Sequence, residues 1–179
     1  FRAMLWAFLI GGTSSVVIAT VIYELLLLLG INDSIISTTI GSFMIIGPVE
    51  EFAKLAGLMM VYAFMKRQFN ELTDGGIYMS CVALGFSIIE NYFYANTGEN
   101  NQYLLVYRAF ISTPAHISFS CLIGYAWYRH KKENKPFGIV ILALMIGSAL
   151  HGIFDALAFS NYLRFLLLIY LYVIINQSL

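Results

Sequence analysis

Charged residues are scarce in this sequence. Only 11% of its 179 residues are Asp, Glu, Lys or Arg, whereas soluble globular domains contain about 25%. Hydrophobic residues make up 60%, and the mean hydropathy is +0.79. The formal net charge of zero gives no indication of nucleic-acid binding. This composition excludes a soluble globular domain and indicates an integral membrane protein.

Cysteine is also rare, with two residues, Cys81 and Cys121, both inside apolar segments. Cysteines in such positions more often pack in the interior than form a disulfide or a ligand set. We therefore assign them no role. No internal repeat and no polar stretch long enough for a soluble domain occurs in the chain.

Six apolar segments account for nearly the whole chain, and a membrane-spanning helix needs about 20 residues. They are residues 4–30, 35–65, 76–96, 103–128, 136–159 and 162–175. We therefore predict an all-α, polytopic membrane helix bundle with about six transmembrane helices, forming a single domain over residues 1–179. The chain begins at Phe1 without an initiator methionine, so we expect it to be trimmed at its termini, with further helices outside it.

Basic residues gather in two of the short polar links, after the second and fourth apolar segments. They are Lys66, Arg67, Arg129, Lys131, Lys132 and Lys135. The positive-inside rule makes these links cytoplasmic. Both termini are then cytoplasmic, and the links at 31–34, 97–102 and 160–164 lie outside. Only Arg164 is on the unexpected side.

Ionisable residues also occur within the apolar segments, where each charge near the bilayer centre costs about 2.5–3.5 kcal/mol. They are Glu24, Glu50, Glu51, Lys54, Glu90, Arg108, His116, His151 and Asp155. Such residues must be paired, solvated in a cavity or functional. We expect Glu24, which stands alone among Tyr and Leu residues, to be structural or interfacial.

Local ion pairs explain part of this set. Glu50 and Glu51 lie four and three residues before Lys54, so either shares a helix face with it. Glu90 and Arg108, on consecutive helices, form a second candidate pair. These pairs leave one glutamate, an aspartate and two histidines without a basic partner.

The spacing of His151 and Asp155 places both on one side of a helix, because residues four apart are about 40° apart around it. They can therefore face a single site, either as a histidine oriented by a carboxylate or as two ligands of one ion.

Two prolines precede polar residues by two positions: Pro48 before Glu50 and Pro114 before His116. Each removes a backbone donor and leaves a carbonyl free one turn earlier, which membrane helices tolerate where neighbours or water satisfy it. We predict a hydrated pocket there. It should open toward the outer half of the membrane, because other polar residues lie near the outer helix ends.

Four motifs stand in order on separate helices: EEFAK at 50–54, FSIIEN at 86–91, RAFISTPAH at 108–116 and HGIFD at 151–155. Together they resemble the PrsW family of intramembrane proteases, bacterial relatives of the type II CAAX prenyl endopeptidases. The resemblance implies a multi-pass protease of the bacterial cytoplasmic (inner) membrane. It also implies cleavage of a membrane-anchored protein near the extracytoplasmic side, with an anti-sigma factor as the best-known class of substrate.

In the CAAX relatives, the first motif supplies a glutamate that activates water together with a histidine of the second motif. The His and Asn of the last motif stabilise the oxyanion. This chain departs from that pattern, with Glu90 in place of the histidine and Asp155 in place of the asparagine. It also has His116, on a motif that the CAAX pattern lacks.

Direct attack by water is the expected chemistry, because we identify no serine or cysteine nucleophile paired with a base. A carboxylate in a low-dielectric site is a suitable general base, which makes Glu50 or Glu51 the candidate. The resemblance favours Glu50, with Glu51 and Lys54 orienting it. Asn91 and Arg108 complete the motifs as supporting residues.

Two versions of the site stay open. In the metal version, Glu90, His116 and His151 bind Zn²⁺ or another divalent ion, with Asp155 as an optional further ligand, since two histidines and one carboxylate form a known catalytic zinc site. In the metal-free version, Glu50 and Glu90 share the water, and His151, aligned by Asp155, donates to the oxyanion.

Two other functions fit parts of the pattern. Buried acids and broken helices also occur in ion- or proton-coupled transporters, and a relative without activity would act as a membrane binding protein. The polar residues cluster at one depth and do not line a path across the membrane. The protease is therefore the favoured prediction.

Overall fold

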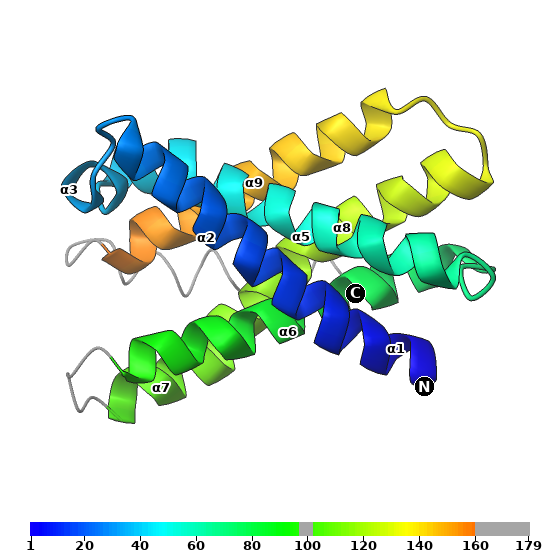
Figure 1. Cartoon of the computed structure of the whole chain (residues 1–179), viewed down its shortest axis with the longest axis horizontal. Coiled ribbons are helices and arrows are strands. Elements are labelled where there is room, and N and C mark those ends of the chain that lie inside the picture. The colour runs from blue at the N-terminus through cyan, green and yellow to red at the C-terminus, as the bar shows by residue number, and fades with distance from the viewer. Residues whose placement is uncertain (97–101, 160–179) are drawn as a thin grey trace.

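The computed structural model describes residues 1–96 and 102–159 (Figure 1). These ranges contain helices and no strand, which confirms the all-α prediction. Three of the helices are continuous through a π-helical segment. The elements are α1 (Arg2–Trp6), η1 (Ala7–Gly11), α2 (Gly12–Leu28), α3 (Asp33–Ile36), α4 (Thr39–Gly41), η2 (Ser42–Ile46), α5 (Gly47–Met65), α6 (Leu72–Ala95), α7 (Gln102–Tyr107), η3 (Arg108–Ser112), α8 (Thr113–Lys132) and α9 (Gly138–Phe159).

Capping residues move two helix starts away from the predicted positions. The second long helix begins at Thr39 and not at residue 35, because the hydroxyl of Thr38 accepts a hydrogen bond from the Gly41 N–H at 2.9 Å. Helix α6 begins at Leu72, where Glu71 and Asp74 form a capping box. The predicted sixth helix, 162–175, lies outside the described residues.

By length and composition, three helices in the described ranges can cross a membrane: Arg2–Leu28, Leu72–Ala95 and Gly138–Ala158. The other two long helices are the one formed by α4, η2 and α5 and the one formed by α7, η3 and α8. They carry the first and third motifs, and the polar residues of these motifs lower their hydropathy. The two less apolar helices are therefore the ones that supply most of the polar site.

A π-helical segment precedes each of the two prolines that the sequence analysis singled out. Segment η2 ends directly before Gly47 and Pro48, and η3 ends directly before Thr113 and Pro114. A π-helical turn shifts the hydrogen bonding from i→i+4 to i→i+5, which accommodates a residue that has no N–H. A third segment, η1, contains no proline, and no local sequence pattern predicts it.

Two glycines, Gly47 and Gly152, allow the helices of the first and last motifs to pack closely. A Cβ atom on Gly47 would collide with the carbonyl oxygen of Ser148, and one on Gly152 would lie 2.5 Å from the Cα of Phe43. Only glycine allows the backbones to approach this closely. As a result, His151, next to Gly152, lies beside the glutamates of α5.

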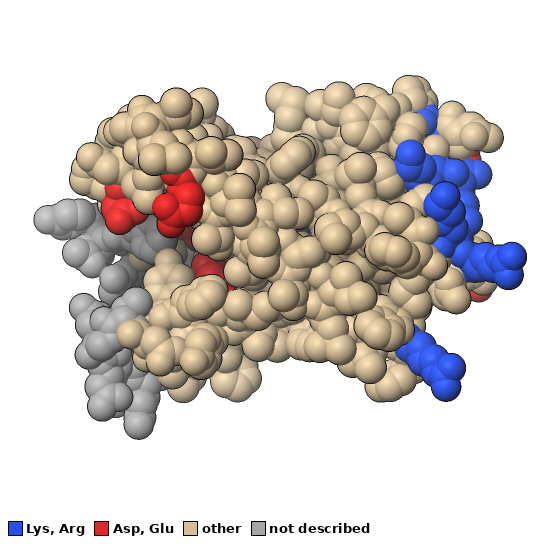
Figure 2. All heavy atoms as spheres, in the orientation of Figure 1, with Lys and Arg blue, Asp and Glu red and all other residues tan. Residues whose placement is uncertain are grey.

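Charge is distributed unevenly between the two ends of the bundle. Figure 2 shows Lys and Arg gathered at the end where the α5–α6 and α8–α9 connections lie, and the visible acidic groups mainly toward the other end. All six basic residues of the two links are exposed. The two basic links thus share one end, as predicted. Because α6 and α9 both start at that end, Glu90 and His151 lie in the opposite half.

Candidate active site

Glu51 is the most enclosed carboxylate, with no exposed surface. Its Oε1 lies 2.8 Å from Lys54 Nζ and 2.9 Å from His151 Nδ1, and its Oε2 accepts a hydrogen bond from Ser120 Oγ at 2.7 Å. Both oxygens are therefore engaged by protein donors. A carboxylate in this state orients its neighbours and has little capacity left to accept a proton from water.

The two ring nitrogens of His151 face different carboxylates. Because the ionised Glu51 can only accept, the His151 Nδ1 carries the proton that faces it. The Nε2 then lies 3.4 Å from Asp155 Oδ2 and 3.7 Å from Glu50 Oε2. The ring of Phe119 stacks on the imidazole at 5.6 Å between centroids. The predicted pairing of His151 with Asp155 on one helix face is confirmed.

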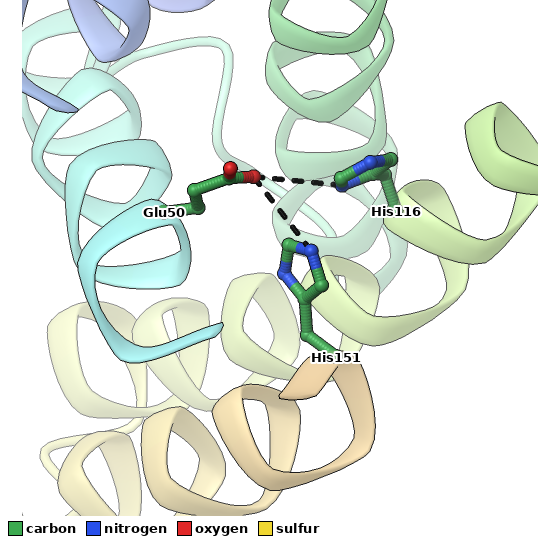
Figure 3. Close-up of side chains that lie close together, drawn as sticks. All are labelled: Glu50, His116 and His151. Carbon is green, nitrogen blue, oxygen red and sulfur yellow. Dashed lines mark ion pairs between the residues drawn. The ribbon is translucent and has the colours of Figure 1, made fainter. Parts of the chain in front are cut away.

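Glu50 has a buried oxygen, Oε2, without a hydrogen-bond partner among the described residues. This atom lies 3.7 Å from His151 Nε2 and 4.0 Å from His116 Nδ1, and Figure 3 shows the carboxylate pointing toward both rings. Ligand atoms of Glu50, His116 and His151 all lie within 4.8 Å of one another, and all three side chains are buried. These are the residues that could hold a metal ion.

His116 is contacted at both ring nitrogens. Lys54 Nζ lies 2.9 Å from Nδ1, and because the ammonium can only donate, Nδ1 accepts. The Nε2 lies 3.2 Å from Glu90 Oε2. Glu90, the carboxylate expected in the metal site, is thus on the side of the ring away from Glu50. The structure groups Glu50 with the two histidines in its place, because Arg108 draws Glu90 toward η3.

Arg108 anchors the second and third motifs to each other. Its Nη2 lies 2.8 Å from Glu90 Oε2, and its Nε donates to Asn91 Oδ1 at 2.7 Å. Asn91 in turn donates to Thr113 Oγ1 at 3.1 Å. The guanidinium lies over the ring of Tyr94, 3.8 Å from its centroid. The predicted Glu90–Arg108 ion pair is confirmed, and the pair fixes Glu90 between Arg108 and His116.

The site has a more open side at Glu90. The side chain of Glu90 is 19% exposed, compared with 12% for Asp155 and 7% for Glu50. Figure 2 shows acidic atoms in a hollow between α2 and α6. Glu90 is therefore the most exposed of these three carboxylates.

The three grouped side chains fit a divalent ion in ligand type and spacing. Two imidazoles and a carboxylate form a known catalytic zinc set, and bonds of about 2.1 Å in tetrahedral geometry separate ligand atoms by about 3.4 Å. The observed 3.7 Å and 4.0 Å separations need only small side-chain movements. Glu51 on the His151 Nδ1 is the outer carboxylate that such sites use to orient a ligand. Coordination through His116 Nδ1 requires Lys54 to give up its hydrogen bond to that atom.

All nine predicted site residues lie in this one connected cluster. Sequence reasoning missed two contacts to its glutamates, Ser120 and Tyr23. Ser120 stands four residues after His116, on the same helix face, and this spacing was an available signal. Tyr23 donates to Glu50 Oε1 at 3.5 Å from outside the four motifs, and no local pattern marks it.

The sequence model of the PrsW family intramembrane metalloproteases matches residues 1–177. The chain belongs to the PrsW family. The resemblance of the four motifs is thereby confirmed, and the family assignment identifies a membrane-embedded peptidase and favours it over a transporter.

Among curated PrsW relatives, the Protease PrsW of Clostridioides difficile (strain 630) is 36% identical over 174 residues, which cover 94% of this chain and 72% of that protein. The Protease PrsW of Bacillus subtilis (strain 168) is 28% identical over 130 residues, 70% of this chain and 58% of the relative. That of Oceanobacillus iheyensis is 31% identical over 125 residues, 66% and 54% respectively. No solved structure matches the chain.

Proposed function

We propose that this PrsW-family chain hydrolyses a peptide bond of a membrane-anchored protein near the extracytoplasmic face of the bacterial cytoplasmic membrane. The substrate class that we propose is an anti-sigma factor. The observation that carries the proposal is the buried group of Glu50, His116 and His151, in which a carboxylate oxygen lacks a hydrogen-bond partner and faces two imidazoles. Its position in the half of the bundle away from the basic links supports cleavage on the outer side.

We propose that Glu50, His116 and His151 hold a divalent ion, with Zn²⁺ as the first candidate. The chemistry that such an ion supplies when bound is polarisation of the scissile carbonyl and a lower pKa for water. Glu51 accepts a hydrogen bond from the N–H at His151 Nδ1 and thereby keeps Nε2 directed at the site. Glu51 is an orienting residue in this scheme, and Glu50 is the carboxylate at the reacting water.

Glu90 is the group that we propose to carry protons between the water and the leaving amine. It is the most exposed carboxylate of the cluster, and Arg108 and His116 hold its Oε2 at 2.8 Å and 3.2 Å. A positioned carboxylate that can accept and return a proton is what amide hydrolysis requires.

The metal-free version keeps the same residues with different roles. Glu50 would be the general base for water, and His151, aligned by Asp155 at 3.4 Å, would donate to the oxyanion. In both versions Glu50 acts directly, as a metal ligand or as the general base, whereas Glu51 only orients its neighbours. The two versions differ in whether activity needs a metal ion.

The decisive experiment uses the purified chain in proteoliposomes with an anti-sigma factor of the same bacterium tagged at both ends. We expect Glu50→Gln to lose cleavage by at least about 100-fold, since removal of a general base or a metal ligand has effects of this order. Glu24→Gln is the matched control, because Glu24 is an exposed glutamate on α2 and should retain activity. Full activity of Glu50→Gln would refute the proposed role.

Metal content separates the two versions. Elemental analysis of protein purified without chelator or metal-binding resin should give about one divalent ion per chain, and chelation should abolish cleavage. A fully active protein with far less than one ion per chain would establish the metal-free scheme. A different cleaved protein with normal metal content would refute only the anti-sigma-factor assignment.

A further inference from the structure

Helices α2 and α5 pack closely through small side chains that repeat every four residues. A Cβ atom on Gly57 would collide with the Ser15 hydroxyl, so the two backbones are very close at this point. Four residues further along α2 and four residues back along α5, Ala19 and Ala53 belong to one buried cluster, with 4% and 0% exposure. The two helices therefore run antiparallel in a fixed register.

This register determines which residues meet next. The following position on α2 is Tyr23, and the following turn on α5 contains Val49 and Glu50. Tyr23 and Val49 both pack against the cluster of Ala19 and Ala53. The Tyr23 hydroxyl lies 3.5 Å from Glu50 Oε1. The contact is thus a consequence of the small-residue packing one turn away.

The two oxygens of Glu50 have different surroundings. Tyr23 is the only residue in the described ranges that hydrogen-bonds to this carboxylate, and it does so at Oε1. Oε2, on the other side, faces the two histidines and lies 3.6 Å from Lys54 Nζ. Lys54 is thus on the side of the histidines, and within the described ranges the Tyr23 hydroxyl is the hydrogen-bond donor on the Oε1 side.

We propose that Tyr23 is a positioning residue, whose hydroxyl fixes the Glu50 carboxylate so that Oε2 faces His116 and His151. The proposal rests on the proposed function, because it gives Glu50 the role of ligand or base. It also gives the first helix, which carries none of the four motifs, a direct part in the site.

The test compares Tyr23→Phe with Tyr128→Phe. Both substitutions remove one hydroxyl and one hydrogen bond, and Tyr128 Oη donates to the Asn70 carbonyl at 3.0 Å, at the basic end of the bundle. Co²⁺ is the probe, with its affinity and visible absorption spectrum measured on detergent-purified apoprotein. Loss of an outer-shell partner typically costs 10- to 100-fold in metal affinity or activity. For a contact as long as 3.5 Å we expect about tenfold weaker Co²⁺ binding and an altered spectrum in Tyr23→Phe only.

A double-mutant cycle shows whether the effect passes through Glu50. In a Glu50→Gln background, Tyr23→Phe should weaken Co²⁺ binding less than twofold further, because the carboxylate that it positions is gone. An equal loss in both backgrounds would mean that Tyr23 acts through packing and would overturn the proposal. So would Co²⁺ affinity and spectrum that match the unaltered chain.

Failure of the metal centre itself is a separate outcome. If the unaltered chain binds no Co²⁺, the metal version of the proposed function is refuted, and the cleavage kinetics decide the role of Tyr23. Positioning of Glu50 then requires a kcat about tenfold lower in Tyr23→Phe with KM unchanged. A kcat equal to that of Tyr128→Phe would overturn the proposal.

Discussion

Replacement of Lys54 by Met should destabilise the protein more than any change at an exposed lysine. Lys54 has no exposed surface, and its Nζ lies 2.8 Å from Glu51, 3.6 Å from Glu50 and 2.9 Å from His116 Nδ1. Methionine has a similar length and no charge, so it leaves two buried carboxylates without their basic partner.

The size of the effect follows from the burial of that pair. Removal of one partner of a buried ion pair costs about 3–5 kcal/mol, because the remaining charge is uncompensated. For a chain of this size each kcal/mol corresponds to about 2–4 °C in Tm. We therefore expect Tm in detergent to fall by roughly 6–20 °C. Removal of both charges in Glu51→Gln/Lys54→Met should recover at least half of the loss, because no unpaired charge then remains at Glu51.

The measurement is thermal unfolding of purified variants at equal detergent concentration, with Lys135→Met as the matched control. Lys135 is exposed, so its replacement should move Tm by no more than about 2 °C. If Lys54→Met unfolded at the temperature of this control, the buried ion pair would not stabilise the fold, and the central place given to Lys54 would be refuted.

Three further predictions concern topology, metal binding and packing. An impermeant thiol reagent added to intact cells should label a single cysteine placed at 97–102 and spare one at 129–135, and the reverse pattern would invert the orientation. Co²⁺ affinity should fall as pH is lowered from about 8 to about 5, because protons compete for the imidazole nitrogens of His116 and His151; a pH-independent affinity would exclude them as ligands. Gly152→Val should reduce cleavage at least about tenfold, because the valine side chain forces α9 away from η2. Normal activity would show that this contact does not position the site.

Much of the site could be predicted because membrane burial limits what an ionisable residue can do. Glu50, Glu51 and Lys54 had to find partners within reach of one helix, and both predicted pairs with Lys54 are present. Arg108 is the one basic residue near Glu90 on the next helix, and that pair is present as well. The cost of an isolated charge in the bilayer leaves few alternatives.

Other features depend on how the helices pack against each other. The spacing of residues along one helix carries no information about this packing. Glu50, rather than Glu90, is the carboxylate that faces both histidines, and Glu90 is instead paired with Arg108. The contact of Tyr23 with Glu50 follows from the register of two helices. Both are set by tertiary packing, so neither the motifs nor the hydropathy of the chain reveals them.

The π-helical segment η3 makes this helix sensitive to the number of its residues. The segment contains one residue more than an α-helical turn. The residues before it are therefore rotated by about 100° around the helix axis. Arg108 lies at its start and His116 lies beyond its end, yet both contact Glu90 Oε2. Deletion of a single residue from 109–112 would leave hydropathy and helix propensity almost unchanged. It would nevertheless turn Arg108 away from Glu90. This segment should therefore tolerate substitutions but not insertions or deletions.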